Sequence, residues 1–297
     1  MPAAHRQVRM SPSASLARLV MMGACALSAG AGQGASTSPT GSEILVRTEG
    51  PKDLLPLASA LRNAWRGQSE DVEMSLGAGL SDRARLEALA SGAIDVAFAG
   101  HALDLSEVAA RGMAAQRIGV TAVVFAVHAD VTVLSLEPAD LCDIFSGKVA
   151  NWSAYGGPDA PIRPVLRPES EPDTEILRAA IPCMKPLTPG KGVVLARTAN
   201  DLRVALQSTS GAIGLTTLAA VKQSIVALRA LSIGSASPTP ANVLGGRYPL
   251  VRPAWLVTRS PPSRSAASFL AFVASDRGAA AIAEAGALPV RPASPYR

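Results

Sequence analysis

The chain has 297 residues, of which 48% are hydrophobic, 17% charged and 4% aromatic, and this composition excludes a disordered chain. Three cysteines without a Cys-x-x-Cys pair, together with three scattered histidines, exclude a dense disulfide framework and predict no structural zinc site. The formal net charge is +5, but residues 1–40 contain three arginines and no acid, so the remainder carries only +2. That excess is too small and too evenly spread to indicate a nucleic-acid-binding protein.

The first forty residues have the pattern of an export signal. Three arginines precede an apolar stretch at 19–29, which ends in the small residues Ala29-Gly30-Ala31. A basic start, an apolar middle and an A-x-A site are typical of a secretory signal peptide, and the stretch falls short of the roughly twenty residues that span a membrane. We therefore predict a signal peptide at 1–31, a flexible N-terminus at 32–42 and a periplasmic protein.

The cysteines leave two questions open. The sequence ending at Cys25 (Met-Gly-Ala-Cys) resembles a lipoprotein box, in which Cys25 would become the lipidated first residue. The alternative is that Cys25 is removed with the signal peptide. In either case the protein leaves the cytoplasm and enters a compartment that permits disulfides. Cys142 and Cys183 either pair there or remain two buried free thiols.

Strand-like and helix-like segments alternate along the rest of the chain. Leu57, Leu61 and Trp65 recur every four residues, as in an amphipathic helix. In chain order we predict a strand at 44–48, a helix at 56–65, a strand at 72–76, a helix at 83–92, strands at 94–100 and 119–131, a helix at 137–147, strands at 162–166 and 192–196, a helix at 200–208 capped by Asn200, strands at 211–215, 224–233 and 251–258, and helices at 263–275 and 277–286. This alternation predicts an α/β protein with largely parallel sheets. The length exceeds one comfortable core, so two lobes are expected.

The most distinctive stretch is LCDIFSGKVANWSAYGGPDAPIRPV at 141–165. It resembles the L-x-x-I-F-x-G-x-x-x-N-W-x-x-x-G-G-x-x-x-x-I-x-x-V stretch of the phosphate-binding periplasmic proteins of ABC transporters. Other matches in the family's order lie at 86–100, 167–174, 211–221 and 246–253. The resemblance therefore extends over nearly the whole mature chain.

The resemblance implies an α/β, two-lobed type II periplasmic-binding-protein fold with a hinge and an interlobe cleft. The implied boundaries are 43–127 plus 248–297 for lobe 1 and 128–247 for lobe 2, with His128 in a strand near the hinge. The resemblance also implies an exported, monomeric solute-binding protein. Such a protein captures a small oxyanion, phosphate by default, and delivers it to a membrane ABC permease.

The chain departs from this family at the loops that bind the anion. GPKD at 50–53 stands where the family has a Gly-Ser-x-Thr-like loop, and SDRARL at 81–86 replaces G-S-G-x-G-I. Gly-His at 100–101 replaces Ser-Arg or Ser-Asp. RPESEPDT at 167–174 corresponds to the R-x-x-x-S-G-T loop, but it is one residue longer and has lost the Ser-Gly pair.

Three residues of this last loop are the leading candidates for ligand contact. An ionised oxyanion is best held by N–H and O–H donors and by a planar guanidinium. Arg167, Ser170 and Thr174 supply these groups, and backbone N–H groups of a helix start would add to them. The alternative is that Arg167 only pairs with Glu169 or Glu171.

Further candidates carry a mixed set of charges. Lys52 would add positive charge, Ser81 opens the second divergent loop, and His101 follows a buried strand at its carboxyl end, where clefts form. Asp53 and Asp173 could each accept a proton from a monoprotonated ligand and so discriminate against fully deprotonated ions. Asp53 could instead be only a helix cap.

Three more charged residues and one tryptophan have ordinary structural explanations. Asp82 is a third acid that could face the ligand, although one such acid would suffice. Arg83 and Arg85 are expected on the solvated face of a helix, where Arg83 can reach Glu87 four residues on. Trp152 is expected to pack against the turn of its own motif.

No catalytic signature is present. The sequence lacks a Gly-x-Ser-x-Gly elbow, a His-Glu-x-x-His pair and a Gly-x-x-x-x-Gly-Lys loop, so no catalytic residue, metal or cofactor is predicted. Two functions remain: capture of a small oxyanion for uptake, or, if the anion site has decayed, a periplasmic sensor or adaptor that binds a protein partner.

Overall fold

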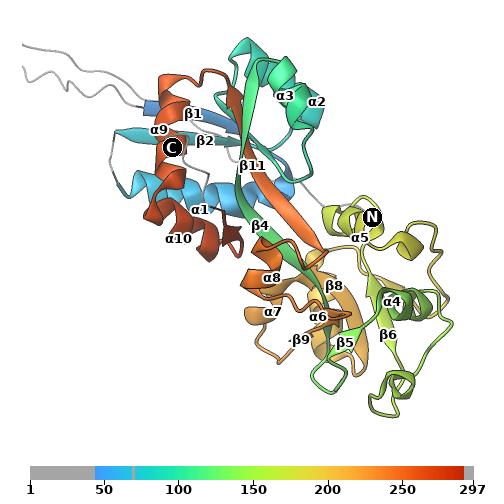
Figure 1. Cartoon of the computed structure of the whole chain (residues 1–297). Helices are drawn as coiled ribbons and strands as arrows, with labels where there is room; N and C mark the ends of the chain where they lie inside the picture. The colour runs from blue at the N-terminus through green and yellow to red at the C-terminus, as the bar shows by residue number, and fades with distance from the viewer. Residues whose placement is uncertain (1–43, 69–70, 291–297) are drawn as a thin grey trace, which may run out of the picture. The chain divides into compact units, whose positions relative to one another are not determined.

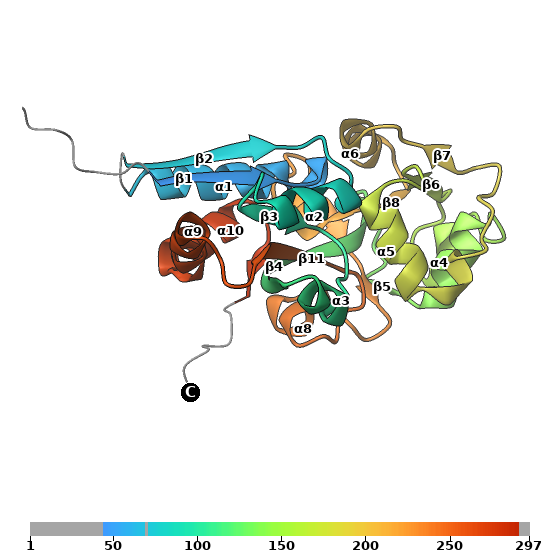
Figure 2. The same ribbon diagram turned by 90° about the horizontal axis from the view of Figure 1, so that it is seen from above.

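The computed structural model describes residues 44–68 and 71–290. The predicted signal peptide at 1–31, the segment at 32–42 and Cys25 lie outside the described residues. Within the described part, helices flank one long sheet (Figures 1 and 2). The prediction of an α/β fold is confirmed.

The sheet has ten strands, and its main path follows the order β2-β1-β3-β11-β4-β8-β6-β7. The strands of this path are β1 (Ile44–Glu49), β2 (Val72–Gly77), β3 (Val96–Ala99), β4 (Met113–Val127), β6 (Arg163–Leu166), β7 (Val194–Leu195), β8 (Ala212–Thr217) and β11 (Val251–Arg259). The shorter strands β9 (Arg229–Ala230) and β12 (Leu288–Pro289) both pair with β4. A separate parallel pair consists of β5 (Ser135–Leu136) and β10 (Ser232–Ile233).

The two ends of the sheet are parallel, but its middle is antiparallel. β1 pairs in parallel with β2 and β3, and β6 pairs in parallel with β7 and β8. β11 and β4 run antiparallel to each other and to their outer neighbours. The prediction of largely parallel sheets is therefore right for the ends and wrong for the middle, because β4 and β11 carry the chain from one half of the sheet to the other and back (Figure 1).

Several helices pack against the half of the sheet around β1. α1 (Leu55–Arg66) lies against β2 and α10 (Asp276–Glu284), α9 (Arg264–Ala274) lies against β1, and α2 (Asp82–Ser91) lies against β3. The predicted apolar stripe of α1 is confirmed, since Leu57, Leu61 and Trp65 are all buried. The indole ring of Trp65 lies 5.2 Å from the ring of Phe269 on α9, which joins the two helices over this core.

The half of the sheet around β6 has its own core. Its helices are α4 (Pro138–Phe145), α5 (Pro172–Ala180), α6 (Ala199–Ser208), α7 (Leu218–Lys222) and α8 (Pro240–Leu244). The remaining helix, α3 (Leu105–Ala110), belongs to the β1 half and lies against β4. Phe125, Phe145 and Trp152 are fully buried in this core. Trp152 packs against Gly157 in the turn of its own motif, as predicted. Its indole N–H also donates to the carbonyl oxygen of Gly211, outside the motif, at 3.0 Å.

Cys142 and Cys183 form a disulfide. It joins α4 to the short 3-10 helix η3 (Pro182–Met184), so the paired alternative is the one observed. A disulfide is typical of a protein that works in an oxidising compartment.

The two halves of the sheet meet within β4. Residues 113–122 of β4 pair with β11, and residues 123–127 pair with β8. At this crossing the backbone N–H of Val123 donates to Leu250, and the hydroxyl of Tyr248 donates to the carbonyl oxygen of Val123, both at 2.9 Å. The outgoing and returning segments are thus tied together where the chain changes halves.

Three local predictions are wrong. The run 224–233 forms only two-residue strands. Leu231 and Ile233 near its end are buried, but its first part is not covered by a neighbouring strand, and Ile225 is 97% exposed. The cap of α6 is Thr198, not Asn200, since Thr198 exchanges reciprocal hydrogen bonds with the third residue of the helix. His128 lies just after β4 rather than in it.

Candidate ligand-binding site

The N-terminus of α5 is the centre of the candidate site. The helix follows the carboxyl end of β6 after a short loop, and Pro172 occupies its first position, where a missing N–H costs nothing. The backbone N–H groups of Thr174 and Glu175 donate to the carbonyl oxygen of Glu171. This geometry places the positive end of a helix dipole at the end of a parallel strand, the usual location of ligands in α/β sheets.

Two buried donors beside this helix start lack a hydrogen-bond partner within the described residues. The side chain of Arg167 is only 10% exposed; its Nη2 pairs with Glu171 at 2.5 Å, while its Nη1 has no partner. The hydroxyl of Thr174, a residue that is 3% exposed, also has none. Leaving a buried donor unsatisfied costs about 1–3 kcal/mol, so two such groups at one helix start fit a site that is completed by a ligand.

Arg252 joins both halves of the sheet at this site. It lies on β11, and its Nη1 is 3.3 Å from Asp53 Oδ2 and 3.3 Å from Asp173 Oδ1. Asp53 belongs to the 3-10 helix η1 (Lys52–Leu54), next to β1, whereas Asp173 belongs to α5. The contact with Asp173 is an ion pair rather than a hydrogen bond, since Asp173 Oδ1 has no hydrogen-bond partner. Arg252 Nε also has no hydrogen-bond partner.

Burial raises the pKa of the Asp173 carboxyl. Arg252 and, more weakly, Arg167 act in the opposite direction, while the nearby carboxylates of Asp53 and Glu171 raise the pKa further. The Asp173 carboxyl therefore takes up a proton at a higher pH than an exposed aspartate does.

A cavity of about 460 Å³, called here the site cavity, brings these groups together. The lining residues that matter for binding are Asp53, Arg167, Glu171, Asp173, Thr217 and Arg252. A second cavity of about 590 Å³, called here the side cavity, lies against the same helix and strand. Its lining includes Pro51, Asp82, His101, Glu175, Ile176 and Pro253.

The loop after β2 is occupied by a side chain of the protein itself. The carboxylate of Glu49 accepts hydrogen bonds from the backbone N–H groups of Gly79 and Leu80 at 2.7 and 2.9 Å. A Cβ at Gly77 would lie 1.6 Å from Glu49 Oε2, so a larger residue there would displace this carboxylate. Backbone donors that could have faced a ligand are therefore satisfied internally.

Arg85 corrects one sequence prediction. Arg83 pairs with Glu87 on the solvated face of α2, as predicted, but Arg85 is 5% exposed rather than solvated. Its guanidinium pairs with Asp82 and donates to the carbonyl oxygen of Leu80. Burial lowers its pKa, while the carboxylates of Glu49 and Asp53 act in the opposite direction, so Arg85 offsets acidic charge inside this half of the protein.

The predicted site residues separate into two groups. The structure brings Asp53, Arg167, Asp173 and Thr174 together at the start of α5, and it places His101 in the wall of the side cavity. The Nδ1 atom of His101 is 3.8 Å from Asp82 Oδ2.

The other predicted residues lie apart. Lys52 and Ser170 are exposed, and neither lines the two cavities. Ser81 is the N-cap of α2, where its hydroxyl accepts from the N–H of Ala84. These three residues have no part in the site proposed below.

Arg252, Glu49 and a ligand-side role for Glu171 were not predicted. The signal for Arg252 was its place in the segment 246–253, which returns from one half of the sheet to the other. Glu49 gave a weaker signal, as an acid at the carboxyl end of the first strand. Neither position could be assigned without knowing which loops meet across the sheet.

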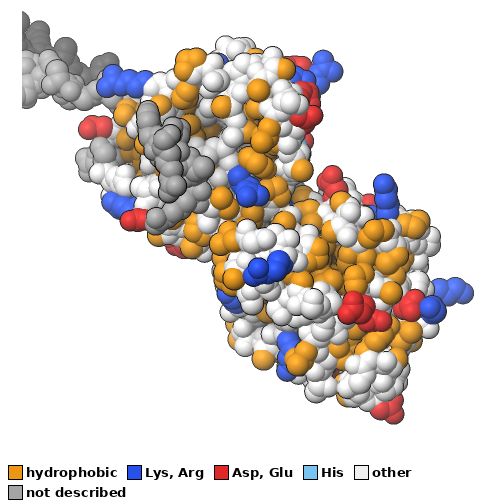
Figure 3. Space-filling view, in the orientation of Figure 1, with side chains coloured by type: hydrophobic (Ala, Val, Ile, Leu, Met, Phe, Trp, Pro, Cys, Tyr) orange, Lys and Arg blue, Asp and Glu red, His pale blue; other side chains and the backbone are white. Residues whose placement is uncertain are grey.

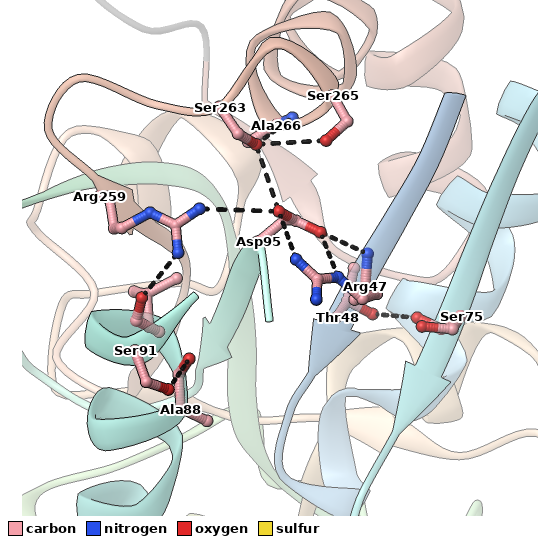
Figure 4. A network of polar contacts seen from close by, with 11 residues as sticks. Arg47, Thr48, Ser75, Ala88, Ser91, Asp95, Arg259, Ser263, Ser265 and Ala266 are labelled. Carbon is pink, nitrogen blue, oxygen red and sulfur yellow. Dashed lines mark hydrogen bonds and ion pairs between the residues drawn. The ribbon is translucent and has the colours of Figure 1, made fainter. Parts of the chain in front are cut away.

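An ion-pair network around the buried carboxylate of Asp95, distinct from this site, lies in the β1 half (Figure 4). Asp95 accepts hydrogen bonds from the backbone and side chain of Arg47, from 2.9 to 3.1 Å, and from the hydroxyl of Ser263 at 3.3 Å. Arg259 lies 3.8 Å away on β11. Burial acts to raise the pKa of Asp95, but the hydrogen bonds and charge of Arg47 outweigh burial, so the pKa is lowered. Asp95 therefore connects β1, β11 and the start of α9.

The described residues add three negative findings about other kinds of site. Across 44–68 and 71–290, no cluster of three or more His, Cys, Asp or Glu side chains is arranged to hold a metal ion. No single helix in the same ranges is long and apolar enough to cross a membrane; α9 and α10 pass that test only as a pair bent by 75°. On the face shown in Figure 3, Lys and Arg side chains are scattered singly and form no basic patch.

Comparison with known proteins gives the family. A model described as the PBP superfamily domain matches residues 31–277 of the chain. The chain belongs to the PBP superfamily. The resemblance to periplasmic phosphate-binding proteins that the motif at 141–165 predicted is thereby confirmed, as is the two-lobed binding-protein fold.

Individual relatives of this PBP superfamily member agree with the assignment. A curated relative is the phosphate-binding protein PstS of Bacillus subtilis, which is 25% identical over 244 residues, or 81% of this chain and 79% of PstS. A solved ABC-type phosphate transport receptor from Vibrio cholerae aligns with a TM-score of 0.65 and 20% identity, over 82% of this chain and 99% of the receptor. A Clostridium perfringens substrate-binding protein solved with bound phosphate aligns with a TM-score of 0.64 and 22% identity, over 83% and 99% of the two chains. At these identities the solved structures show the fold alone.

Proposed function

We propose that this chain is an exported solute-binding protein that captures phosphate, or an oxyanion of similar shape and charge, for ABC-type uptake. The ligand lies between two lobes, 43–127 plus 248–297 and 128–247, and closure of the lobes around it produces the form that a membrane permease recognises. The protein acts as a monomer, and its role is binding rather than catalysis. Names of curated relatives that match most of the chain support phosphate as the ligand class.

The observation that carries this proposal is the pair of unsatisfied donors at the start of α5. Arg167 Nη1 and Thr174 Oγ1 are buried without a hydrogen-bond partner in the described part of the chain, and they lie beside a helix N-terminus. An oxyanion bound in the site cavity, which Arg167 lines, would satisfy Arg167 Nη1 and would gain from the helix dipole.

Arg252 gives the proposal a mechanism that links binding to closure. Its guanidinium pairs with Asp53 from one lobe and Asp173 from the other. A dianion that enters the site cavity competes with both carboxylates for Arg252. The ligand then replaces protein carboxylates as the group that holds the two lobes together.

The acids of the site set the limits of anion binding. The site cavity is lined by three acids and three arginines: Asp53, Glu171, Asp173, Arg167, Arg203 and Arg252. The cavity is therefore close to neutral before a ligand enters. Protonation of Asp173, whose pKa is raised by burial, removes one repulsive charge. A protonated Asp173 can also donate its hydrogen to a ligand oxygen.

The alternative role, a periplasmic sensor or adaptor with a decayed anion site, is not favoured. It predicts no unsatisfied donors at the start of α5, whereas two are present. Lipidation at Cys25 stays a prediction.

Equilibrium dialysis with radiolabelled phosphate tests the proposal. The protein is first unfolded and refolded to remove any ligand carried through purification. We expect saturable binding of one phosphate per chain, with weaker competition from sulfate and none from acetate. Absence of bound label at millimolar phosphate would remove the proposed function.

A further inference from the structure

The side cavity lies directly beside the site cavity. The side cavity shares Asp53 with it, and the same two elements form walls of both. On β11, Arg252 lines the site cavity, whereas its neighbours Val251 and Pro253 line the side cavity, as the alternation of a strand requires. α5 likewise presents Asp173 to the site cavity and Glu175 to the side cavity. The site cavity and the side cavity therefore lie next to each other, on either side of α5 and β11.

The donors in this region are concentrated on one side of the site. Arg167, Thr174 and the helix start all belong to the α5 side. On the opposite side, Pro51 has no N–H to offer, and the N–H groups of the loop after β2 are occupied by Glu49. Apart from Arg252, which β11 contributes, this opposite side offers few donors to an oxygen of inorganic phosphate. A phosphorus centre that carries an organic group in place of that oxygen would lose little.

The side cavity has the chemistry of an organic subsite. Its walls include apolar side chains from Pro51, Ile176 and Pro253. Its volume of about 590 Å³ lies in the range typical of organic ligands and is far more than one phosphate oxygen needs.

The charge of the side cavity is acidic. Asp53 and Asp82 are paired with Arg252 and Arg85 respectively. Glu175 also lines the cavity, and its carboxylate has no ion-pair partner among the residues that the structure describes. An unpaired carboxylate beside apolar walls favours a small cation over a second anion.

We propose that the ligand is a phosphate monoester or phosphonate with a short organic group that ends in an amine or quaternary ammonium. This inference rests on the proposed function and narrows its ligand class. The phosphorus oxygens bind Arg167 and Arg252, which line the site cavity. The organic group enters the side cavity, where its cation faces Glu175.

The proposal is tested by titration of the ligand-freed protein with four compounds at matched ionic strength. These are inorganic phosphate, methyl phosphate, phosphoethanolamine and phosphocholine. We expect the better of the two cationic esters to bind at least tenfold more tightly than inorganic phosphate and than methyl phosphate. Methyl phosphate separates the effect of the cation from that of the ester bond.

Two variants place the organic group. Glu175→Gln removes the charge, and Ala179→Leu fills space in the side cavity from an exposed helix position. Each is expected to lower the ratio of the affinity for the cationic ester to that for inorganic phosphate by threefold or more. Glu284→Gln on α10, an exposed acid outside both cavities, is the matched control and should leave the ratio unchanged.

Each result decides between the inference and the proposed function. If inorganic phosphate binds as tightly as the cationic esters, the inference is overturned and phosphate capture stands. If the cationic esters bind more tightly but neither variant changes the ratio of ester affinity to phosphate affinity, the organic group does not lie in the side cavity. The inference is then again overturned. If none of the four compounds binds, the proposed function fails, and the inference fails with it.

Discussion

Replacing Arg167 by alanine is the most informative single change at the candidate site. One of its two terminal nitrogens is already bound to Glu171, so only Nη1 is free for a ligand. A hydrogen bond to a charged group contributes about 1.5–3 kcal/mol, and each 1.4 kcal/mol corresponds to a tenfold change in affinity. Loss of this bond should therefore weaken phosphate binding by roughly 10- to 150-fold.

A secondary effect acts in the same direction. Without Arg167, the carboxylate of Glu171 loses its partner and faces the ligand as an unpaired negative charge. The double variant Arg167→Ala/Glu171→Gln should consequently recover part of the lost affinity. Such recovery separates electrostatic repulsion from damage to the fold.

Isothermal titration with phosphate at fixed ionic strength measures these changes. Arg163→Ala is a matched control, since Arg163 begins the strand β6 that leads to Arg167, is exposed and makes no ion pair within the described part of the chain. Thermal unfolding of each variant establishes that it is folded. An Arg167→Ala affinity within twofold of the unmodified protein, with the fold intact, would refute the assignment of Arg167 to the ligand.

Three further predictions concern protonation and stability. Because burial raises the pKa of Asp173, phosphate affinity relative to that of Asp173→Asn should rise as the pH is lowered, beginning above the pH at which an exposed aspartate titrates; parallel pH profiles for the two proteins would contradict this role. Asp95→Asn should lower the free energy of unfolding by about 2 kcal/mol, less than for a fully buried pair because the Arg47 side chain is 44% exposed. The pKa of Asp95 is lowered, so this contribution is present above its ordinary value near 4 and is lost as the pH falls below it; denaturant unfolding at pH 7 and pH 3 checks the sign, and an equal difference at both pH values would count against the network. Replacing Cys142 and Cys183 by serine should lower stability by up to about 4 kcal/mol from loop-closure entropy, given their separation of 41 residues; denaturant midpoints that coincide with and without the bond would show that this bond stabilises nothing.

Much of the fold followed from local patterns in the sequence. The apolar stripe of α1, the Pro138 start of α4 and the buried strand β3 are each determined by residues a few positions apart, and each was predicted correctly. The run 224–233 misled because β-branched residues favour a strand only when a neighbouring strand buries them. No neighbouring strand buries Ile225, which is 97% exposed.

The candidate site was only partly predictable for a related reason. Arg167 and Thr174 lie in one loop, whose resemblance to an anion-binding motif could be read directly. Arg252 joins the site from a strand about eighty residues further on, and only the folded sheet brings it to Asp53 and Asp173. Arg85 was placed in solvent because helical spacing indicates a face but not what covers that face.

Thermal unfolding of residues 32–297, freed of ligand and tested against a panel of oxyanions, examines the central claim most directly. The panel holds phosphate, sulfate, molybdate, tungstate and acetate at matched ionic strength. A ligand at a hundred times its dissociation constant adds about 2.7 kcal/mol of stability, which corresponds to a rise in Tm of roughly 5–10 °C for a protein of this size. Phosphate capture at the start of α5 predicts such a rise with phosphate, and a smaller rise in Arg167→Ala. No rise with any anion of the panel would contradict it.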